Sequence, residues 1–200
     1  DARLEQGPRE VVLSGIITGF YFGFGGVLSS TVGASLGGTG MPIGVQRFLF
    51  GAVGFPLSVF LTTVAGGQAF TPNIAVMATA LLRKGESPRL LRTRGQTMVT
   101  NLSLAFLGNA IGLIMIALLA NIAALPAVPA AVAISKAKCS MTFNQVLIRS
   151  ILGGWLIGMA TWTAKAAPDV GSKFLLIWVC MSTYATCQFE HCLANLFFVP

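Results

Sequence analysis

The polar residues that could take part in chemistry lie in two short stretches of an otherwise apolar chain. The only histidine, His191, follows Glu190 in QFEHCLAN, and Thr71 lies in AGGQAFTPN. An imidazole exchanges a proton readily near neutral pH. A hydroxyl beside the free N–H groups of a helix start donates hydrogen bonds that an anion accepts. Together these groups suit the binding of a small anion and the handling of a proton.

Two further polar residues extend this prediction. Lys138 is the candidate partner of Glu190, because a buried carboxylate requires a cation; the alternative is that Lys138 is an ordinary loop charge. Asn195 either orients His191 or bridges a break in the backbone. Structural alternatives exist for the first pair too, since Thr71 could cap a helix and His191 could join two helices by a hydrogen bond.

A metal site is the competing interpretation of the second stretch. Cys187, His191 and Cys192 are close in sequence, whereas Cys139 and Cys180 lie elsewhere. A tetrahedral zinc site takes four ligands, typically in pairs such as C-x2-C, and only three lie together here. The sequence shows no serine–histidine–acid arrangement and no pair of carboxylates. We therefore expect no metal, no cofactor and no enzymatic activity, with an intramembrane metal enzyme as the third alternative.

Composition decides the class of protein that must position these residues. The chain has 200 residues, of which 54% are hydrophobic and only 10% charged, where a soluble domain carries about 25% charged residues. Its mean hydropathy is +0.79. So few charges cannot cover a globular surface, which excludes a soluble secreted domain, disorder, collagen and a coiled coil. Nucleic-acid binding is also excluded, because the net charge of +7 is typical of loops on a membrane protein.

The charged residues divide the chain into apolar runs long enough to cross a bilayer. Uncharged runs cover 36 positions at 11–46, 35 at 48–82, 41 at 95–135, 15 at 150–164 and 16 at 174–189. A bilayer core of about 30 Å requires roughly 20 helical residues, so the last two helices must include flanking residues. We expect helices at 11–33, from near 45, at 100–123, at 143–164 and from near 174. The segments 36–44 and 125–131 are expected to be connections.

Lysine and arginine are distributed unevenly over the two ends of these helices. Nine fall on one side and four on the other: Arg3, Arg9, Arg83, Lys84, Arg89, Arg92, Arg94, Lys165 and Lys173 against Arg47, Lys136, Lys138 and Arg149. Cytoplasmic loops carry the excess of basic residues. The N-terminus and the 83–94 loop are therefore predicted to be cytoplasmic and 125–142 external, in a plasma or inner membrane, with an organelle membrane as the alternative.

Two of the expected helices are interrupted. Gly66, Gly67 and Gln68 weaken the second helix, and Thr71–Pro72 has the form of a new helix start with Thr71 as the N-cap. The fifth helix is interrupted in CQFEHCLAN. Broken helices at matching positions in two halves are typical of transporters and channels built from inverted repeats.

The chain is thus predicted to be a single transmembrane domain over 1–200, an all-α membrane protein with two broken helices. The first repeat covers about 11–124 and the second about 125–200. Because the second repeat holds two helices where the first holds three, we expect five of six helices to be present and the sequence to be a fragment that lacks the sixth. Gly15, Gly19, Gly23 and Gly26 recur near every fourth residue and predict close packing of the first helix.

These stretches resemble two signatures of the formate/nitrite transporter family. QFEHCLANLFFVP at 188–200 is similar to the family's Gly-Phe-Glu-His-Ser-x-Ala-Asn-Met-Tyr/Phe, and AGGQAFTPN at 65–73 to its Gly-Ala-Glu/Asp-Leu-Phe-Thr-x-Asn. Lys138 matches in spacing the lysine that precedes the family's fourth helix. The chain departs from the family at Gln68, which replaces the acidic residue, at Gln188, which replaces a glycine, and at Gly154, which replaces an asparagine.

The resemblance implies a homopentamer of aquaporin-like bundles, each with its own pore for small monovalent anions such as formate or nitrite, usually moved with a proton. It implies that Thr71 faces His191, with apolar constrictions above and below formed by Phe55, Val59, Phe70 and Tyr184. A neutral-solute channel of the aquaporin or ammonia type is the alternative. Aquaporins, however, carry paired Asn-Pro-Ala motifs at their breaks, where this chain has Thr-Pro-Asn and Leu-Ala-Asn.

Overall fold

The computed structural model describes residues 6–81 and 88–198, which form α-helices and contain no strand. In chain order these helices are α1 (Pro8–Leu36), α2 (Ile43–Val53), α3 (Phe55–Val64), α4 (Phe70–Leu81), α5 (Pro88–Ile122), α6 (Ala127–Cys139), α7 (Phe143–Ala166), α8 (Val170–Thr186) and α9 (Cys192–Phe198). Four stretches within the described residues are long and apolar enough to cross a membrane: Pro8–Leu36, Ile43–Val64, Arg92–Ile122 and Phe143–Ala166. The chain is an all-α membrane protein.

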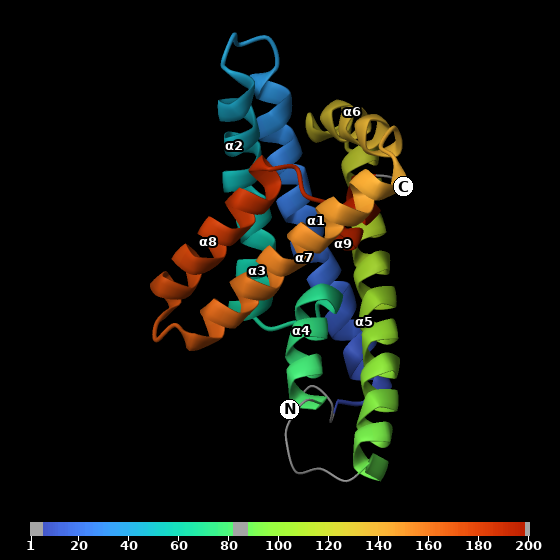
Figure 1. The fold of residues 1–200 in the computed structure, drawn as a ribbon. Helices are drawn as coiled ribbons and strands as arrows, with labels where there is room; N and C mark the ends of the chain where they lie inside the picture. The colour runs from blue at the N-terminus through green and yellow to red at the C-terminus, as the bar shows by residue number, and fades with distance from the viewer. Residues whose placement is uncertain (1–5, 82–87, 199–200) are drawn as a thin grey trace.

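The longest helices, α1 and α5, lie side by side and form the spine of the molecule (Figure 1). A Cβ atom on Gly19 would come within 2.5 Å of the Asn109 carbonyl oxygen and 2.8 Å of the Gly112 Cα. Only glycine allows two helix backbones to approach this closely. The close packing predicted from the glycines of the first helix is confirmed, and Gly108 and Gly112 supply the matching surface on α5.

Both predicted interruptions are present, and they divide the two halves in the same way. In the first half, α3 ends at Val64 and α4 begins at Phe70, while in the second half α8 ends at Thr186 and α9 begins at Cys192. α1 precedes the first broken helix and α7 precedes the second. The two breaks approach each other beside the spine, so that α4 and α9 both begin in the interior of the molecule (Figure 1).

A bend separates α2 from α3 within one predicted span. Gly54 lies between them, and a Cβ atom there would come within 2.3 Å of both the Gly25 carbonyl oxygen and the Ser29 hydroxyl oxygen of α1. The bend therefore lies where α1 comes closest to the second span. Trp178 of α8 donates a hydrogen bond of 2.9 Å from its ring N–H to the Ala52 carbonyl just before the bend.

Two predicted connections are shorter than expected. The segment 125–131 is mostly helical, because α6 begins at Ala127. Its alanines favour a helix, and Pro129 lies in the first turn, where a missing N–H breaks no helical hydrogen bond. The 83–94 loop is also shorter, since α5 begins at Pro88; Arg83 and Lys84 lie outside the described residues.

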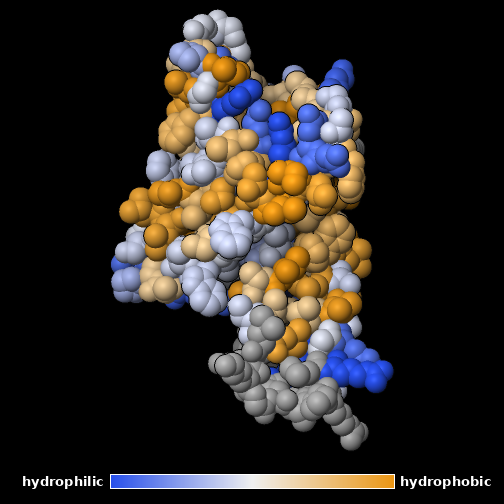
Figure 2. All heavy atoms as spheres, in the orientation of Figure 1, coloured by the Kyte–Doolittle hydropathy of each residue, from blue (hydrophilic) through white to orange (hydrophobic). Residues whose placement is uncertain are grey.

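Large apolar side chains cover much of the outer surface. Figure 2 shows them across the middle of one face, with the more hydrophilic residues toward its ends. On α7, Trp155 is 74% exposed and Trp162 60%. Such a surface is unfavourable in water and suits contact with lipid or with a neighbouring subunit.

Candidate functional site

A hydrogen bond between Thr71 and His191 joins the two breaks. The Thr71 hydroxyl oxygen lies 2.6 Å from His191 Nε2, although the two residues are 120 positions apart in the chain. Thr71 belongs to the first turn of α4, and His191 directly precedes α9. The predicted pair is therefore brought together at the meeting point of two helix starts, and His191 is only 6% exposed.

The hydrogen bonds of His191 define the tautomer of its neutral ring. The backbone N–H of Ala194 donates to Nδ1 at 3.4 Å. Nδ1 is therefore the acceptor nitrogen, and the proton of the neutral ring lies on Nε2. Nε2–H then donates to the Thr71 oxygen, which leaves the Thr71 hydroxyl hydrogen available for another acceptor. Cys192 Sγ lies 3.9 Å from that hydroxyl oxygen.

The prediction that Thr71 is the N-cap of α4 is wrong. The helix begins at Phe70, so Thr71 already lies in its first turn. The Asn73 N–H bonds to the Ala69 carbonyl at 3.0 Å, which makes Ala69 the first residue to accept a helical bond. The N–H of Phe70 is satisfied by a side chain from α5, the Asn109 Oδ1 at 2.9 Å. The Thr71 hydroxyl is thereby left to bond His191.

Asn109 holds the first break in place, and the sequence reasoning missed it. Besides accepting from Phe70, its amide donates to the Gly15 carbonyl at 2.9 Å and to the Gln68 carbonyl at 2.8 Å. The side chain is fully buried. One residue of α5 thus ties α1, the break and α4 together. An isolated amide inside the apolar run LGNAIG is the signal that could have identified it.

An ion pair holds the second break. Lys138 Nζ lies 2.6 Å from both carboxylate oxygens of Glu190, so the pair predicted from charge compensation is present. Glu190 is 3% exposed and the Lys138 side chain 17%. Lys138 lies in the last turn of α6 rather than in a loop, and its ammonium group is 6.0 Å from the centre of the Phe198 ring.

Arg149 of α7 adds backbone contacts to the same break. Its carbonyl accepts a hydrogen bond from the Glu190 N–H at 3.3 Å, and its guanidinium donates to the Gln188 carbonyl at 3.4 Å. Gln188 has a φ of 56°, a left-handed conformation that reverses the chain direction after α8. Gly153 lies one turn along α7, and a Cβ atom there would come within 2.6 Å of the Glu190 carbonyl oxygen.

The predicted constriction residues belong to one apolar cluster but contact different neighbours within it. Tyr184 and Phe55 pack with ring centres 5.9 Å apart, and the Tyr184 ring is 6.2 Å from that of His191. Phe70 instead packs on Phe106 of α5 at 5.2 Å. Val59 is 1% exposed on α3. Phe22 of α1, which the sequence reasoning did not select, lies 6.2 Å from the His191 ring.

Asn195 contributes a backbone hydrogen bond to the second break. Its N–H donates to the His191 carbonyl at 3.1 Å as the first helical bond of α9. Its side-chain oxygen is buried and has no hydrogen-bond partner within 6–81 and 88–198. In the same described ranges, no group of three histidine, cysteine or acidic side chains is placed to hold a metal ion.

Comparison of the whole chain with known proteins identifies its family. The model of the formate/nitrite transporter family matches residues 1–200, the whole chain. This chain belongs to the formate/nitrite transporter family.

Relatives and solved structures agree with this assignment. A probable formate transporter from Methanothermobacter thermautotrophicus is 28% identical, over 98% of this chain and 76% of its own length. The nitrite transporter NirC of Salmonella typhimurium is also 28% identical, over 98% of this chain and 69% of its own. Among solved structures, a pentameric formate channel with formate bound has a TM-score of 0.83 at 25% identity, covering 96% of this chain and 74% of that one. These relatives are transporters and channels, not enzymes.

Two of the three departures from the formate/nitrite transporter signatures have structural roles, and the third lies where the chain makes no close contact. Gln68, at the acidic position, is 2% exposed and accepts a hydrogen bond from the Asn73 amide within the first break. Gln188, at the glycine position, adopts the left-handed conformation that glycine adopts most easily. Gly154 on α7 has no atom within 4 Å of the place where a Cβ would lie, so a side chain there would meet no neighbour in the chain.

Proposed function

We propose that this protein carries small monovalent anions of the formate or nitrite type across the membrane, each with a proton, along a path past Thr71 and His191. The observation that carries the proposal is the 2.6 Å hydrogen bond between these two side chains where the helix breaks meet. The printed functions of the relatives, formate and nitrite transport, support this substrate class.

Electrostatics at the centre favours an anion. α4 starts beside Thr71, and the free N–H groups and positive dipole end of a helix start attract negative charge. Within the part of the chain that the structure describes, the Thr71 hydroxyl lies 2.6 Å from His191 Nε2 and 3.9 Å from the Cys192 sulfur. With Nε2–H as the donor in the first contact, the hydroxyl hydrogen could be donated to a passing oxyanion. The hydroxyl would then accept a hydrogen bond from the imidazole and donate one to the anion.

The apolar surroundings explain why a proton should travel with the anion. Phe22 and Tyr184 lie beside the His191 ring, and Phe55 packs on Tyr184. A bare anion would lose most of its hydration against these rings at a high cost in free energy, whereas the neutral acid would not. Protonation at or near His191 would therefore lower the barrier to passage. Lys138, 17% exposed, compensates the charge of Glu190 beside this path.

The working unit is proposed to be a homopentamer. The similar solved structure is described as pentameric, and the exposed apolar side chains of this chain are compatible with both lipid and subunit contacts. The excess of basic residues on one side of the helices supports a cytoplasmic N-terminus as part of the proposal. Reaction of an Arg94→Cys variant with a membrane-impermeant reagent from outside sealed, right-side-out vesicles would contradict this orientation.

Transport by the purified chain in lipid vesicles tests the proposal. Uptake of labelled formate and of nitrite would be measured with and without an imposed proton gradient, beside the rate of osmotic water flow. We expect saturable anion uptake that increases when the external solution is acidic. Water flow without anion uptake would contradict the proposal and favour the neutral-solute channel.

A further inference from the structure

A proline removes the usual donor of one backbone carbonyl in the second span. Pro56 is the second residue of α3 and has no N–H, so the Ala52 carbonyl, four residues earlier, cannot accept the bond that would continue α2 into α3. The ring N–H of Trp178 on α8 bonds to this carbonyl at 2.9 Å instead. A side chain from the second half of the chain therefore replaces a helical donor of the first half.

The backbone around this bond is held from two sides. A Cβ atom on Gly51 would come within 2.7 Å of the Ala185 Cβ on α8, and Gly54 is similarly close to the backbone of α1. Trp178 also packs edge-on against Phe48 of α2, with ring centres 6.1 Å apart. The bend is thus wedged between α1 and α8, and the indole of Trp178 gives it a polar contact with α8.

The first residue after the bend belongs to the apolar surroundings of the central pair. Phe55 begins α3, and its ring centre lies 5.9 Å from that of Tyr184, which lies 6.2 Å from the ring of His191. Trp178 and Tyr184 are both on α8, separated by about 9 Å along the helix axis. One helix therefore carries both the donor that holds the bend and the ring on which Phe55 packs.

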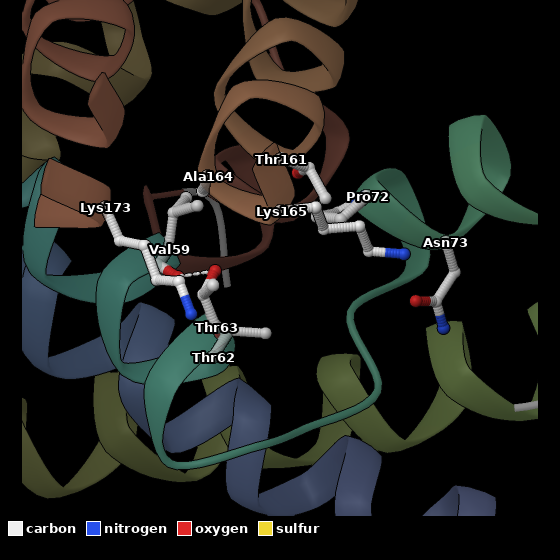
Figure 3. A pocket seen from close by; sticks show the side chains of 9 residues that line it. All are labelled: Val59, Thr62, Thr63, Pro72, Asn73, Thr161, Ala164, Lys165 and Lys173. Atoms are coloured by element: carbon white, nitrogen blue, oxygen red, sulfur yellow. Dashed lines mark hydrogen bonds between the residues drawn. The ribbon is translucent and has the colours of Figure 1, made fainter. Parts of the chain in front are cut away.

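The helix that follows the bend is short and also lines a cavity. Val59 lies one turn after Phe55 on α3, which has 10 residues. It borders a cavity of about 220 Å³ among α3, α4, α7 and α8, together with Lys165 and Lys173 (Figure 3). A displacement of α3 at the bend would therefore move Phe55 and Val59 together.

We propose that Trp178 is a positioning residue for the anion path. Its bond to the Ala52 carbonyl fixes the bend at Gly54 and so holds Phe55 against Tyr184 at the separation that limits the size of a passing anion. This inference rests on the proposed function, because Phe55 and Tyr184 border the proposed path. Without the bond, α3 tilts about the bend and the distance between the two rings is no longer fixed. Larger monovalent carboxylates then pass more easily relative to formate.

The ratio of two uptake rates tests this role. Initial uptake of labelled formate and of labelled acetate, which is larger by one methyl group, would be measured in vesicles and corrected for uptake by protein-free vesicles. Trp178→Phe keeps an aromatic ring and removes the N–H. It should lower the formate-to-acetate ratio at least about threefold, since a well-shaped apolar site distinguishes one such group by about tenfold or more. A loss of folded protein would lower both rates and leave their ratio unchanged.

An exposed tryptophan provides the matched control. Trp162 on α7 is 60% exposed, and Trp162→Phe makes the same chemical change away from the bend. The formate-to-acetate ratio of this variant should equal that of the unmodified chain.

A second background tests whether the bond to Ala52 is the cause. Pro56→Ala restores an N–H that can bond to the Ala52 carbonyl within the helix. In that background Trp178→Phe should change the ratio by less than about 1.5-fold, because the carbonyl no longer depends on the indole. An equal change in both backgrounds would assign the effect to ring packing and overturn the proposal.

The remaining outcomes separate this proposal from the proposed function. Absence of formate uptake by the unmodified chain overturns the proposed function itself. With formate uptake present, an unchanged ratio in Trp178→Phe, or the same change in Trp162→Phe, overturns only the role of Trp178.

Two further variants apply even if Trp178→Phe does not fold. Trp178→Phe/Pro56→Ala has a donor for the Ala52 carbonyl and should then yield folded protein; failure of this double variant as well would contradict the proposal. Phe55→Ala widens the passage directly and should lower the formate-to-acetate ratio at least as far as Trp178→Phe. An unchanged ratio in Phe55→Ala would show that the position of Phe55 does not limit anion size.

Discussion

Lys138 lies 2.6 Å from both carboxylate oxygens of Glu190, the residue that precedes His191. The ion pair therefore connects α6, which lies beside the end of the bundle, to the break that presents the histidine. Because Glu190 is 3% exposed, its charge depends on this one ammonium group for compensation. The ion pair therefore stabilises the second break and also helps to fix the position of His191.

Removal of one partner of the ion pair should therefore lower the free energy of unfolding more than removal of both partners. Lys138→Met leaves a buried, uncompensated carboxylate and should lower the free energy of unfolding by about 3 kcal/mol. Lys138→Met/Glu190→Gln removes both charges and should recover a large part of that loss. Thermal unfolding of the detergent-solubilised protein is measured for the unmodified chain, Lys138→Met, Glu190→Gln and the double variant. Strictly additive effects of the two single changes would show that the pair is not energetically coupled.

The second prediction concerns the proton. His191→Ala and His191→Phe should reduce proton-linked formate uptake by at least about tenfold, because neither side chain can exchange a proton or bond Thr71. His191→Gln is the matched control: it can donate a hydrogen bond to Thr71 but cannot titrate, so residual uptake should no longer respond to pH. The measurement is initial uptake as a function of external pH at equal protein content. An unchanged pH profile in all three variants would leave His191 with a structural role only.

Thr71→Val tests the hydroxyl without changing the shape of the side chain. The substitution removes the acceptor of the His191 Nε2–H bond and the donor that faces the path. Uptake should decrease less than in His191→Ala, because a titratable imidazole remains, and the pH dependence or the preference between formate and nitrite should change. Thr79→Val, on the exposed side of the same helix, is the control and should behave like the unmodified chain. Identical behaviour of the two variants would exclude a direct role for the Thr71 hydroxyl.

The breaks could be predicted from sequence because their signals are local, whereas the pairing of Thr71 with His191 was implied by the resemblance to the family's two signatures. Polar and ionisable residues are rare inside membrane-spanning helices, so QAFTP and QFEH stand out within apolar runs. Charge compensation led from Glu190 to Lys138, since few cations were available. The helix α6 was not predicted, because Pro126 and Pro129 suggested a loop, whereas prolines in the first turn break no hydrogen bond.

Contacts between distant backbones left no such signal. The bend at Gly54 depends on the approach of α1, and Gly54 is one of 23 glycines in the chain. Asn109 bonds carbonyls 94 and 41 positions away, a relation that only the fold creates. The cavity at Lys165 and Lys173 likewise depends on how α7 and α8 pack on α3.

Asn109→Ala should destabilise the first break. It removes one acceptor and two donor bonds and leaves the Phe70 N–H and the Gly15 and Gln68 carbonyls without these partners, a loss of about 2–4 kcal/mol. Asn121→Ala, an exposed asparagine on the same helix, is the control and should change stability by less than about 0.5 kcal/mol. Unfolding temperature and hydrogen exchange at 65–73 report the difference. Equal protection of that segment in both variants would contradict the stabilising role of Asn109.

Two neighbouring glycines on α7 provide a paired test of the second break. A Cβ on Gly153 would come within 2.6 Å of the Glu190 carbonyl oxygen, whereas one on Gly154 would meet no atom within 4 Å. Because the nearest atom is backbone, Gly153→Ala must displace the Phe189–His191 segment. It should lower formate uptake and thermal stability together, by an overpacking cost of about 1–3 kcal/mol.

Gly154→Ala should instead leave uptake unchanged and raise stability slightly, since alanine favours a helix by about 1 kcal/mol over glycine. Uptake and unfolding temperature of both variants, measured in the same lipid and at equal protein content, check the pair. If Gly153→Ala transports as well as Gly154→Ala, then the close approach of α7 at Gly153 does not fix the position of Glu190. In that case the geometry of the second break must depend on Lys138 and Arg149 alone.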